Sequence, residues 1–159
     1  MKKRIWLLLL IVFASILLTG CALQTVDEMY ALPKRSKEYD SLQSAIDSAM
    51  YGLSYSAPVS GENQQTVQMA DLDGDGVEEY IVFAQGSSAN PLQVLIFRQE
   101  EDGTCRLMEV IQSNGSAFEQ VEYVQMDNAP GYELVVGRQL SDQVLRSVSV
   151  YSFSSGSAE

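Results

Sequence analysis

The stretch from residue 71 to residue 84, DLDGDGVEEYIVFA, constrains the fold of this chain more than any other. Aspartates stand at alternate positions, Asp71, Asp73 and Asp75, and Glu79 follows four residues later. Calcium in proteins takes about six to eight oxygen ligands, and a loop with acids at its positions 1, 3, 5 and 9 can place them around one ion. Without a cation, these carboxylates repel one another. The stretch therefore predicts a calcium-binding turn that leads into a strand.

Two further residues of the loop support a cation site. Gly76, at position 6, allows the sharp turn that a residue with a Cβ would resist. The backbone carbonyl of Val77, at position 7, would supply another oxygen ligand. One alternative stays open, namely a solvated acidic turn that binds no ion. The metal-binding residues predicted from the sequence are Asp71, Asp73, Asp75, Val77 and Glu79.

An EF-hand is the obvious rival, and the sequence after the loop argues against it. An EF-hand loop has a bidentate Glu at position 12 and continues into a helix, whereas position 12 here is Val82. The residues Glu79-Tyr80-Ile81-Val82-Phe83 are β-branched and aromatic, which indicates a strand. A dockerin is excluded on the same ground, because its similar loop also leads into a helix.

The pattern D-x-D-x-D-G-x-x-E, followed by an apolar strand, resembles the FG-GAP or VCBS repeats. Those repeats form calcium-binding blades of β-propellers, as in integrin α-chain heads and many bacterial surface proteins. The resemblance covers residues 65–153 and is specific in the loop. It implies a mainly β fold of antiparallel, four-stranded, propeller-blade-like repeats, with one structural calcium ion and a role at the cell surface.

The N-terminus has the features of a bacterial export signal. Lys2-Lys3-Arg4 forms a positive n-region, and Ile5 to Leu17 is an almost unbroken apolar h-region. Leu18-Thr19-Gly20-Cys21 resembles a bacterial lipobox, which implies cleavage before Cys21 and acyl chains on that residue. We therefore expect a lipoprotein signal peptide over residues 1–20 and an extracytoplasmic protein anchored to the membrane by Cys21. An uncleaved membrane helix is the open alternative.

A tether and a helix are expected before the β-domain. Residues 21–35 contain Pro33 and a basic pair, which favour a tether. In the segment 36–64, Ser36 is a suitable N-cap, and apolar residues at helical spacing predict a helix that ends near Gly52 and packs against the β-domain. The rest of this segment is expected to be linker, either a loop or an irregular strand.

Residues 65–159 are predicted to form a β-repeat domain. Repeat one, over residues 65–115, would be a four-stranded antiparallel blade, and repeat two, over residues 116–153, would be incomplete. The strands expected for repeat one are Thr66–Ala70, Tyr80–Gln85, Leu92–Gln99 and Thr104–Gln112. Those expected for repeat two begin with Phe118–Met126 and Tyr132–Gly137, and a third includes residues 148–151.

A spacing of 54 residues relates the two repeats. It aligns Glu79–Val82 with Glu133–Val136, and Val94–Phe97 with Val148–Tyr151. A spacing preserved across two segments is stronger support for a repeat than either match alone. The second loop, Asp127-Asn128-Ala129-Pro130-Gly131, reads as two residues shorter and without the acids of positions 3 and 5, so we expect it to bind no calcium.

The composition excludes several functional classes. The 159 residues include no histidine, which removes Ser-His-Asp and Cys-His catalysis and histidine-ligated zinc sites. Three of the ten basic residues lie in residues 1–20, so the mature chain keeps seven against 21 acidic residues, a net charge of −14. That charge argues against nucleic acid as a partner. We expect no enzyme activity, and we expect Cys105 to be an unpaired apolar residue buried in a strand.

These features together predict a lipid-anchored, calcium-stabilised β-repeat protein that acts as a surface binding or interaction module for a protein or a glycan. Two alternatives stay open. The chain could be an accessory or truncated part of a polysaccharide- or protein-processing surface enzyme system, or a purely structural envelope lipoprotein. The sequence names no ligand, because propeller repeats host many unrelated functions.

Overall fold

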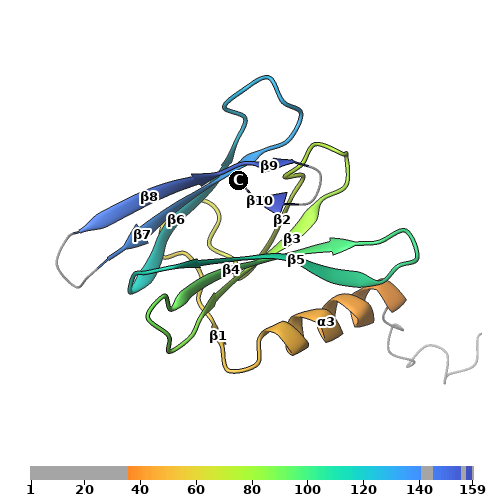
Figure 1. The fold of residues 1–159 in the computed structure, drawn as a ribbon, viewed down its shortest axis with the longest axis horizontal. Coiled ribbons are helices and arrows are strands. Elements are labelled where there is room, and N and C mark those ends of the chain that lie inside the picture. Colours follow the sequence, from red (N-terminus) through yellow and green to blue (C-terminus); the bar gives the residue numbers. More distant parts are fainter. Residues whose placement is uncertain (1–35, 141–144, 155–156, 159) are drawn as a thin grey trace, which may run out of the picture. The chain divides into compact units, whose positions relative to one another are not determined.

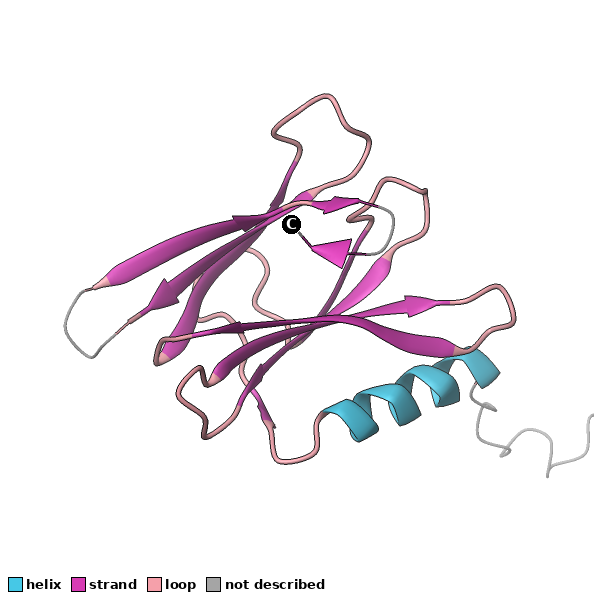
Figure 2. Cartoon of the chain, viewed as in Figure 1, coloured by secondary structure: helices cyan, strands magenta, loops and turns pink. Residues whose placement is uncertain are grey.

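The computed structural model describes residues 36–140, 145–154 and 157–158 (Figures 1 and 2). The predicted signal peptide, the tether and the lipidation of Cys21 all fall outside these described residues. The described elements follow one another in the order α3 (Lys37–Ala49), β1 (Ser54–Tyr55), β2 (Val67–Ala70), β3 (Glu79–Gln85), β4 (Leu92–Gln99), β5 (Cys105–Ser113), β6 (Ala117–Val124), β7 (Glu133–Gln139), β8 (Arg146–Tyr151), β9 (Phe153–Ser154) and β10 (Ser157–Ala158).

The first sheet is an antiparallel meander in which β2, β3, β4 and β5 follow in chain order. The short strand β1 pairs with the end of β3 that lies beyond β2. β3 and β4 are nearly continuous apolar runs, and such strands need cover on both faces. Five of the seven residues of β3 and five of the eight of β4 are buried, so both strands lie in the interior of the domain.

The second sheet contains β6, β7 and β8, also antiparallel and in chain order. The segment between β1 and β2 runs along the other edge of β6. There the backbone N–H groups of Val59 and Ser60 donate to the carbonyls of Phe118 and Glu119, at 3.1 and 2.8 Å. The linker between the helix and the first repeat is therefore hydrogen-bonded to the second repeat.

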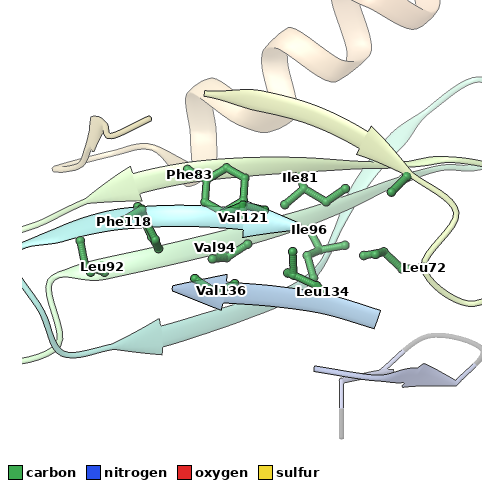
Figure 3. Close-up of a cluster of buried hydrophobic side chains, with 11 residues drawn as sticks. Leu72, Ile81, Phe83, Leu92, Val94, Ile96, Phe118, Val121, Leu134 and Val136 are labelled. Carbon is green, nitrogen blue, oxygen red and sulfur yellow. The ribbon is translucent and has the colours of Figure 1, made fainter. Parts of the chain in front are cut away.

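The two sheets pack face to face around one apolar cluster (Figure 3). The rings of Phe83 and Phe118 meet edge to face across the interface, with their centroids 5.1 Å apart. Burial of this cluster supplies the main driving force that holds the sheets together. Its buried members are Ala70, Leu72, Ile81, Phe83, Leu92, Val94 and Ile96 from the first repeat, and Phe118, Val121, Leu134 and Val136 from the second.

Helix α3 covers the opposite face of the first sheet (Figure 1). Ser36 caps it as predicted, because its side-chain oxygen accepts a hydrogen bond from the backbone N–H of Tyr39. Ile46 is buried against a second apolar cluster that includes Val82, Leu95 and Phe97 of the sheet. The expected packing of this helix on the β-domain is confirmed.

The 54-residue spacing relates faces of the sheets as well as strands. The residues of the first sheet that contact the second sheet include Ile81, Phe83, Val94 and Ile96, and their equivalents are Val135, Gly137, Val148 and Val150. Val148 and Val150 are 67% and 47% exposed. One face of the second sheet therefore packs on the first sheet. Its other face is equivalent to the face by which the first sheet contacts the second, and no described residues cover it.

The prediction of a mainly β, antiparallel fold preceded by a short helix is confirmed. β4 has the predicted bounds, and β6 ends at Val124 instead of Met126, because the backbone N–H of Met126 donates to the Glu133 side chain instead of a strand partner. In the described part of the chain neither sheet closes on itself. The assignment of these sheets to propeller blades therefore stays a prediction.

We expect Phe118→Ala to lower the free energy of unfolding by about 3–5 kcal/mol, because its ring is fully buried between the sheets and its loss leaves a cavity. Urea denaturation followed by fluorescence or circular dichroism would measure this. Val148→Ala is the matched control, since this exposed side chain should change stability by no more than about 0.5 kcal/mol. Similar losses in both variants would contradict the two-sheet core.

Candidate metal centre

The acidic loop connects β2 to β3, and its own backbone holds its carboxylates in place. Both oxygens of Asp71 accept backbone hydrogen bonds, Oδ1 from Gly74 at 2.8 Å and Oδ2 from Gly76 at 3.0 Å. Oδ1 of Asp75 accepts one from Val77 at 2.8 Å. Gly76 has a φ of +87°, as the predicted sharp turn requires. The sequence of the loop thus determines a compact turn whose N–H groups fix its acids.

Glu79 begins β3 and is the buried acid of this group, with a relative exposure of 3%. Its Oε2 accepts a hydrogen bond from the backbone N–H of Leu72 at 2.9 Å, across the base of the loop. Burial raises the pKa of the Glu79 carboxyl, and the hydrogen bonds from Leu72 and Arg98 oppose that rise. A nearby positive charge is therefore needed to keep this carboxylate ionised at little cost.

Arg98, near the end of β4, supplies one such charge. Its Nε and Nη2 both donate to Oε1 of Glu79, at 3.0 and 2.8 Å, and Nη2 also donates to Oδ2 of Asp73. The distance from Nη2 to Oδ2 of Asp75 is 3.7 Å. Hydrogen bonds from the guanidinium to Asp73 and Glu79 raise the pKa of Arg98, so it stays charged. The loop thus contains a counter-ion of its own, contributed by a neighbouring strand.

Three of the five predicted ligands converge. Asp71, Asp73 and Glu79 each offer an oxygen, and these oxygens lie within 4.8 Å of one another. Asp75 is outside this group and more exposed, with 44% of its side chain accessible. The backbone N–H of Val77 donates to Oδ1 of Asp75, and the side chain of Val77 is half exposed. The structure therefore brings together positions 1, 3 and 9 of the loop and leaves positions 5 and 7 at its surface.

The acidic loop packs directly on the loop between β6 and β7. The backbone N–H of Tyr132 donates to the carbonyl of Asp71 at 3.0 Å. A Cβ on Gly74 would lie 2.6 Å from the backbone nitrogen of Gly131, and a Cβ on Gly131 would lie 2.3 Å from the carbonyl oxygen of Leu72. Glycine is required at both positions because the two backbones are in contact. The order of one loop thus depends on the other.

The second loop has the same length as the first, which corrects the reading of a loop two residues shorter. Glu133 Oε2 accepts from the backbone N–H of Met126 at 2.8 Å, across the same seven-residue separation as Glu79 and Leu72. Asp127 accepts from Ala129 as Asp73 accepts from Asp75. Asp127 is thus the acid of position 3, and positions 1 and 5 are Gln125 and Ala129. The error came from aligning Asp127 with the first acid of the loop.

Arg98 was not among the site residues predicted from the sequence, although the sequence contains a signal for it. In the structure the hairpin of β3 and β4 pairs Tyr80 with Phe97, so Glu79 and Arg98 stand opposite each other at its open end. An acid and a base facing each other across two apolar strands indicate an ion pair. The register of that hairpin would have shown that the loop's acids have a cationic neighbour.

Two other features bear on the predicted chemistry. Cys105 is an unpaired thiol, half-buried against the apolar cluster between helix α3 and the first sheet, and burial raises its pKa. A raised pKa reduces the thiolate that reactivity requires, in keeping with a packing role. Among the described residues, no helix is long and apolar enough to cross a membrane.

Comparison with family models, with curated proteins and with solved structures found no match to this chain.

We expect Arg98→Met to lower the free energy of unfolding by about 3–5 kcal/mol in the presence of a chelator, because it removes the counter-ion of nearly buried Glu79 and Asp73. Urea denaturation would measure the loss. Arg146→Met is the matched control, since the side chain of this arginine is 66% exposed in its pair with Glu119. The substitution should change the free energy of unfolding by less than about 0.5 kcal/mol. Equal effects of the two variants would show that Arg98 does not stabilise the loop.

Proposed function

We propose that this chain is a calcium-stabilised β-repeat protein, anchored outside the cell membrane by a lipid on Cys21, that acts as a surface binding or interaction module. The calcium ion would have a structural role, in which it holds the loop between β2 and β3 against the loop between β6 and β7. The chain would serve as a scaffold and would catalyse no reaction. The resemblance to FG-GAP or VCBS repeats favours this function.

The observation that carries the calcium proposal is the charge around the loop. Residues 71–79 carry five acids, since Glu78 is present beside the four predicted ligand acids. The guanidinium of Arg98 contacts three of these acids and offsets a single charge. Four negative charges remain on a loop that also packs against a second backbone. A divalent cation would relieve that repulsion, and its binding energy would then stabilise the folded state.

The residues present fit a hard cation. Each oxygen of an ionised carboxylate has two lone pairs. Both oxygens of Asp71 and Oε2 of Glu79 each accept one backbone hydrogen bond, which orients the oxygen and leaves a lone pair free. Asp71, Asp73 and Glu79 would hold the ion, with Asp75 and the Val77 carbonyl as further ligands. Carboxylate and carbonyl oxygens favour calcium, which accepts irregular coordination, over magnesium, which demands a stricter octahedron.

Calcium at ten times its Kd should add about 1.4 kcal/mol to the stability of the folded protein, by linkage. For a domain of this size that raises Tm by about 3–6 °C. Thermal melts in calcium and in chelator, at equal ionic strength, would measure the shift. The double variant Asp71→Asn, Asp73→Asn should lose it.

The matched control for that melt is Asp47→Asn, which removes an exposed carboxylate from helix α3 and should keep the full calcium response. A calcium shift of the same size in wild type and in the double variant would place the effect elsewhere on this acidic protein. A cooperative melt that calcium leaves unchanged would overturn the metal proposal and make the loop an ordinary acidic turn.

The anchoring proposal predicts the mass of the protein made in a bacterium that processes lipoproteins. The wild-type chain should lack residues 1–20 and carry lipid on Cys21, because two or more acyl chains give stable membrane attachment. The variant Cys21→Ser should retain residues 1–20 and carry no lipid. Intact-mass spectrometry distinguishes the two, and a wild-type chain of full length without lipid would show an uncleaved membrane helix instead.

A further inference from the structure

The equivalent of the Arg98 site exists in the second repeat without its arginine. The 54-residue spacing places Asp127 where Asp73 stands, Glu133 where Glu79 stands, and Ser152 where Arg98 stands. In the first repeat the guanidinium of Arg98 lies between the two carboxylates. In the second repeat a serine takes the place of that long cationic side chain, while both acids remain.

The space that an arginine would fill is open in the second repeat. A cavity of about 210 Å³ lies there, and the corresponding cavity beside Arg98 is about 20 Å³. The larger cavity is lined by Asp127, Glu133 and Ser152, and by Asp73 of the first loop, whose carboxylate already pairs with Arg98. Its other lining residues are Leu72, Ala129, Gly131, Tyr132 and Phe153. Tyr132 is 42% exposed, so part of its ring is accessible to a ligand.

Glu133 gives independent support for a ligand at this cavity. It is 6% exposed, and its Oε2 accepts the backbone N–H of Met126. Among the described residues no cation forms an ion pair with it, in contrast to Glu79, which has Arg98. Burial of a carboxylate without a counter-ion is unfavourable. A cationic group that enters the cavity would remove that cost.

We propose that the cavity between the second loop and the β8–β9 junction binds a guanidinium group of a ligand, in the way that Arg98 occupies the first repeat. Asp127 and Glu133 would pair with the guanidinium, Ser152 would leave room for it, and the ring of Tyr132 would lie at the rim, where aromatic faces attract cations. This inference rests on the proposal that the chain is a binding module, and it names the chemistry of one ligand.

The chemistry of the cavity favours a guanidinium over a metal ion. The second loop has Gln125 and Ala129 at positions 1 and 5, so two of the four acids of the first loop are absent. A planar guanidinium with five donors suits two carboxylates and an aromatic rim better than a compact ammonium does. The net charge of −14 on the mature chain would also attract a cationic partner over a distance.

The test uses the purified full chain and two capped tripeptides, one with arginine and one with neutral citrulline between glycines. Titrations followed by ¹H–¹⁵N NMR should show saturable chemical-shift changes at the amides of Glu133 and Ser152 with the arginine peptide, and none with the citrulline peptide. Glu133→Gln and Asp127→Asn should each weaken binding by ~10-fold or more, because each removes one charge-assisted contact. Both substitutions keep a side-chain acceptor for the loop's backbone N–H groups.

Ser152→Arg is the decisive variant, because it supplies in cis the group that the ligand would supply. It should abolish peptide binding, while the control Val148→Arg, which adds the same charge at an exposed position outside the cavity, should bind as wild type does. Free arginine that binds as well as the peptide would support the site and assign it to a small guanidinium compound. Equal binding of the citrulline peptide, no saturable shift with the arginine peptide, or unchanged binding by Ser152→Arg would overturn the proposal.

Each titration is run in calcium and in chelator, beside the calcium melt. Peptide binding that is absent in both conditions, with an intact calcium response, would overturn the guanidinium site alone. Peptide binding that persists while calcium leaves the melt unchanged would support the guanidinium site and overturn only the metal proposal.

Discussion

Burial of β3 and β4 on both faces is the constraint from which the rest of the domain follows. Their side chains are apolar at successive positions, so each face of the first sheet needs a covering layer. Helix α3 covers one face, and the second sheet covers the other. The linker between β1 and β2 then runs along β6, which fixes the two sheets to each other through backbone hydrogen bonds.

The same arrangement brings the charged groups together. Glu79 and Arg98 lie on the face of the first sheet that packs on the second, one register position beyond its apolar pairs. At that end of the sheet the core gives way to the two loops, which contact each other through Gly74 and Gly131. Ionised side chains can therefore be nearly buried there, provided that each finds a partner. The balance of charge at this junction is consequently linked to the packing of the two repeats.

Much of the fold could be predicted from the sequence, because β3, β4 and the helix have strong local patterns. Ser36 fixed the start of the helix, and the run Leu92–Gln99 gave the bounds of β4 without error. The site was predicted in part. Local spacing located Asp71, Asp73 and Glu79, whereas Arg98 comes from another strand and depends on the hairpin register. The alignment of Asp127 was wrong although the 54-residue spacing, applied to the loop, already matches Asp127 to Asp73, and the hydrogen bond from Met126 to Glu133 supports that equivalence.

The 54-residue spacing between the two sheets shows that the two ends of the domain are not equivalent. The face of the first sheet that contacts the helix, with Val82, Leu95 and Phe97, corresponds in the second sheet to the face with Val136, Ser149 and Tyr151, which is turned toward the first sheet. Helix α3 thus occupies the place that an earlier sheet would take in a continuing stack, and acts as a cap at that end. Two copies of the domain cannot extend the stack by repeating the contact between the sheets, because the helix blocks the complementary face in each copy. Capping at one end limits this kind of head-to-tail growth into a filament, even though the last sheet is uncovered by the described residues.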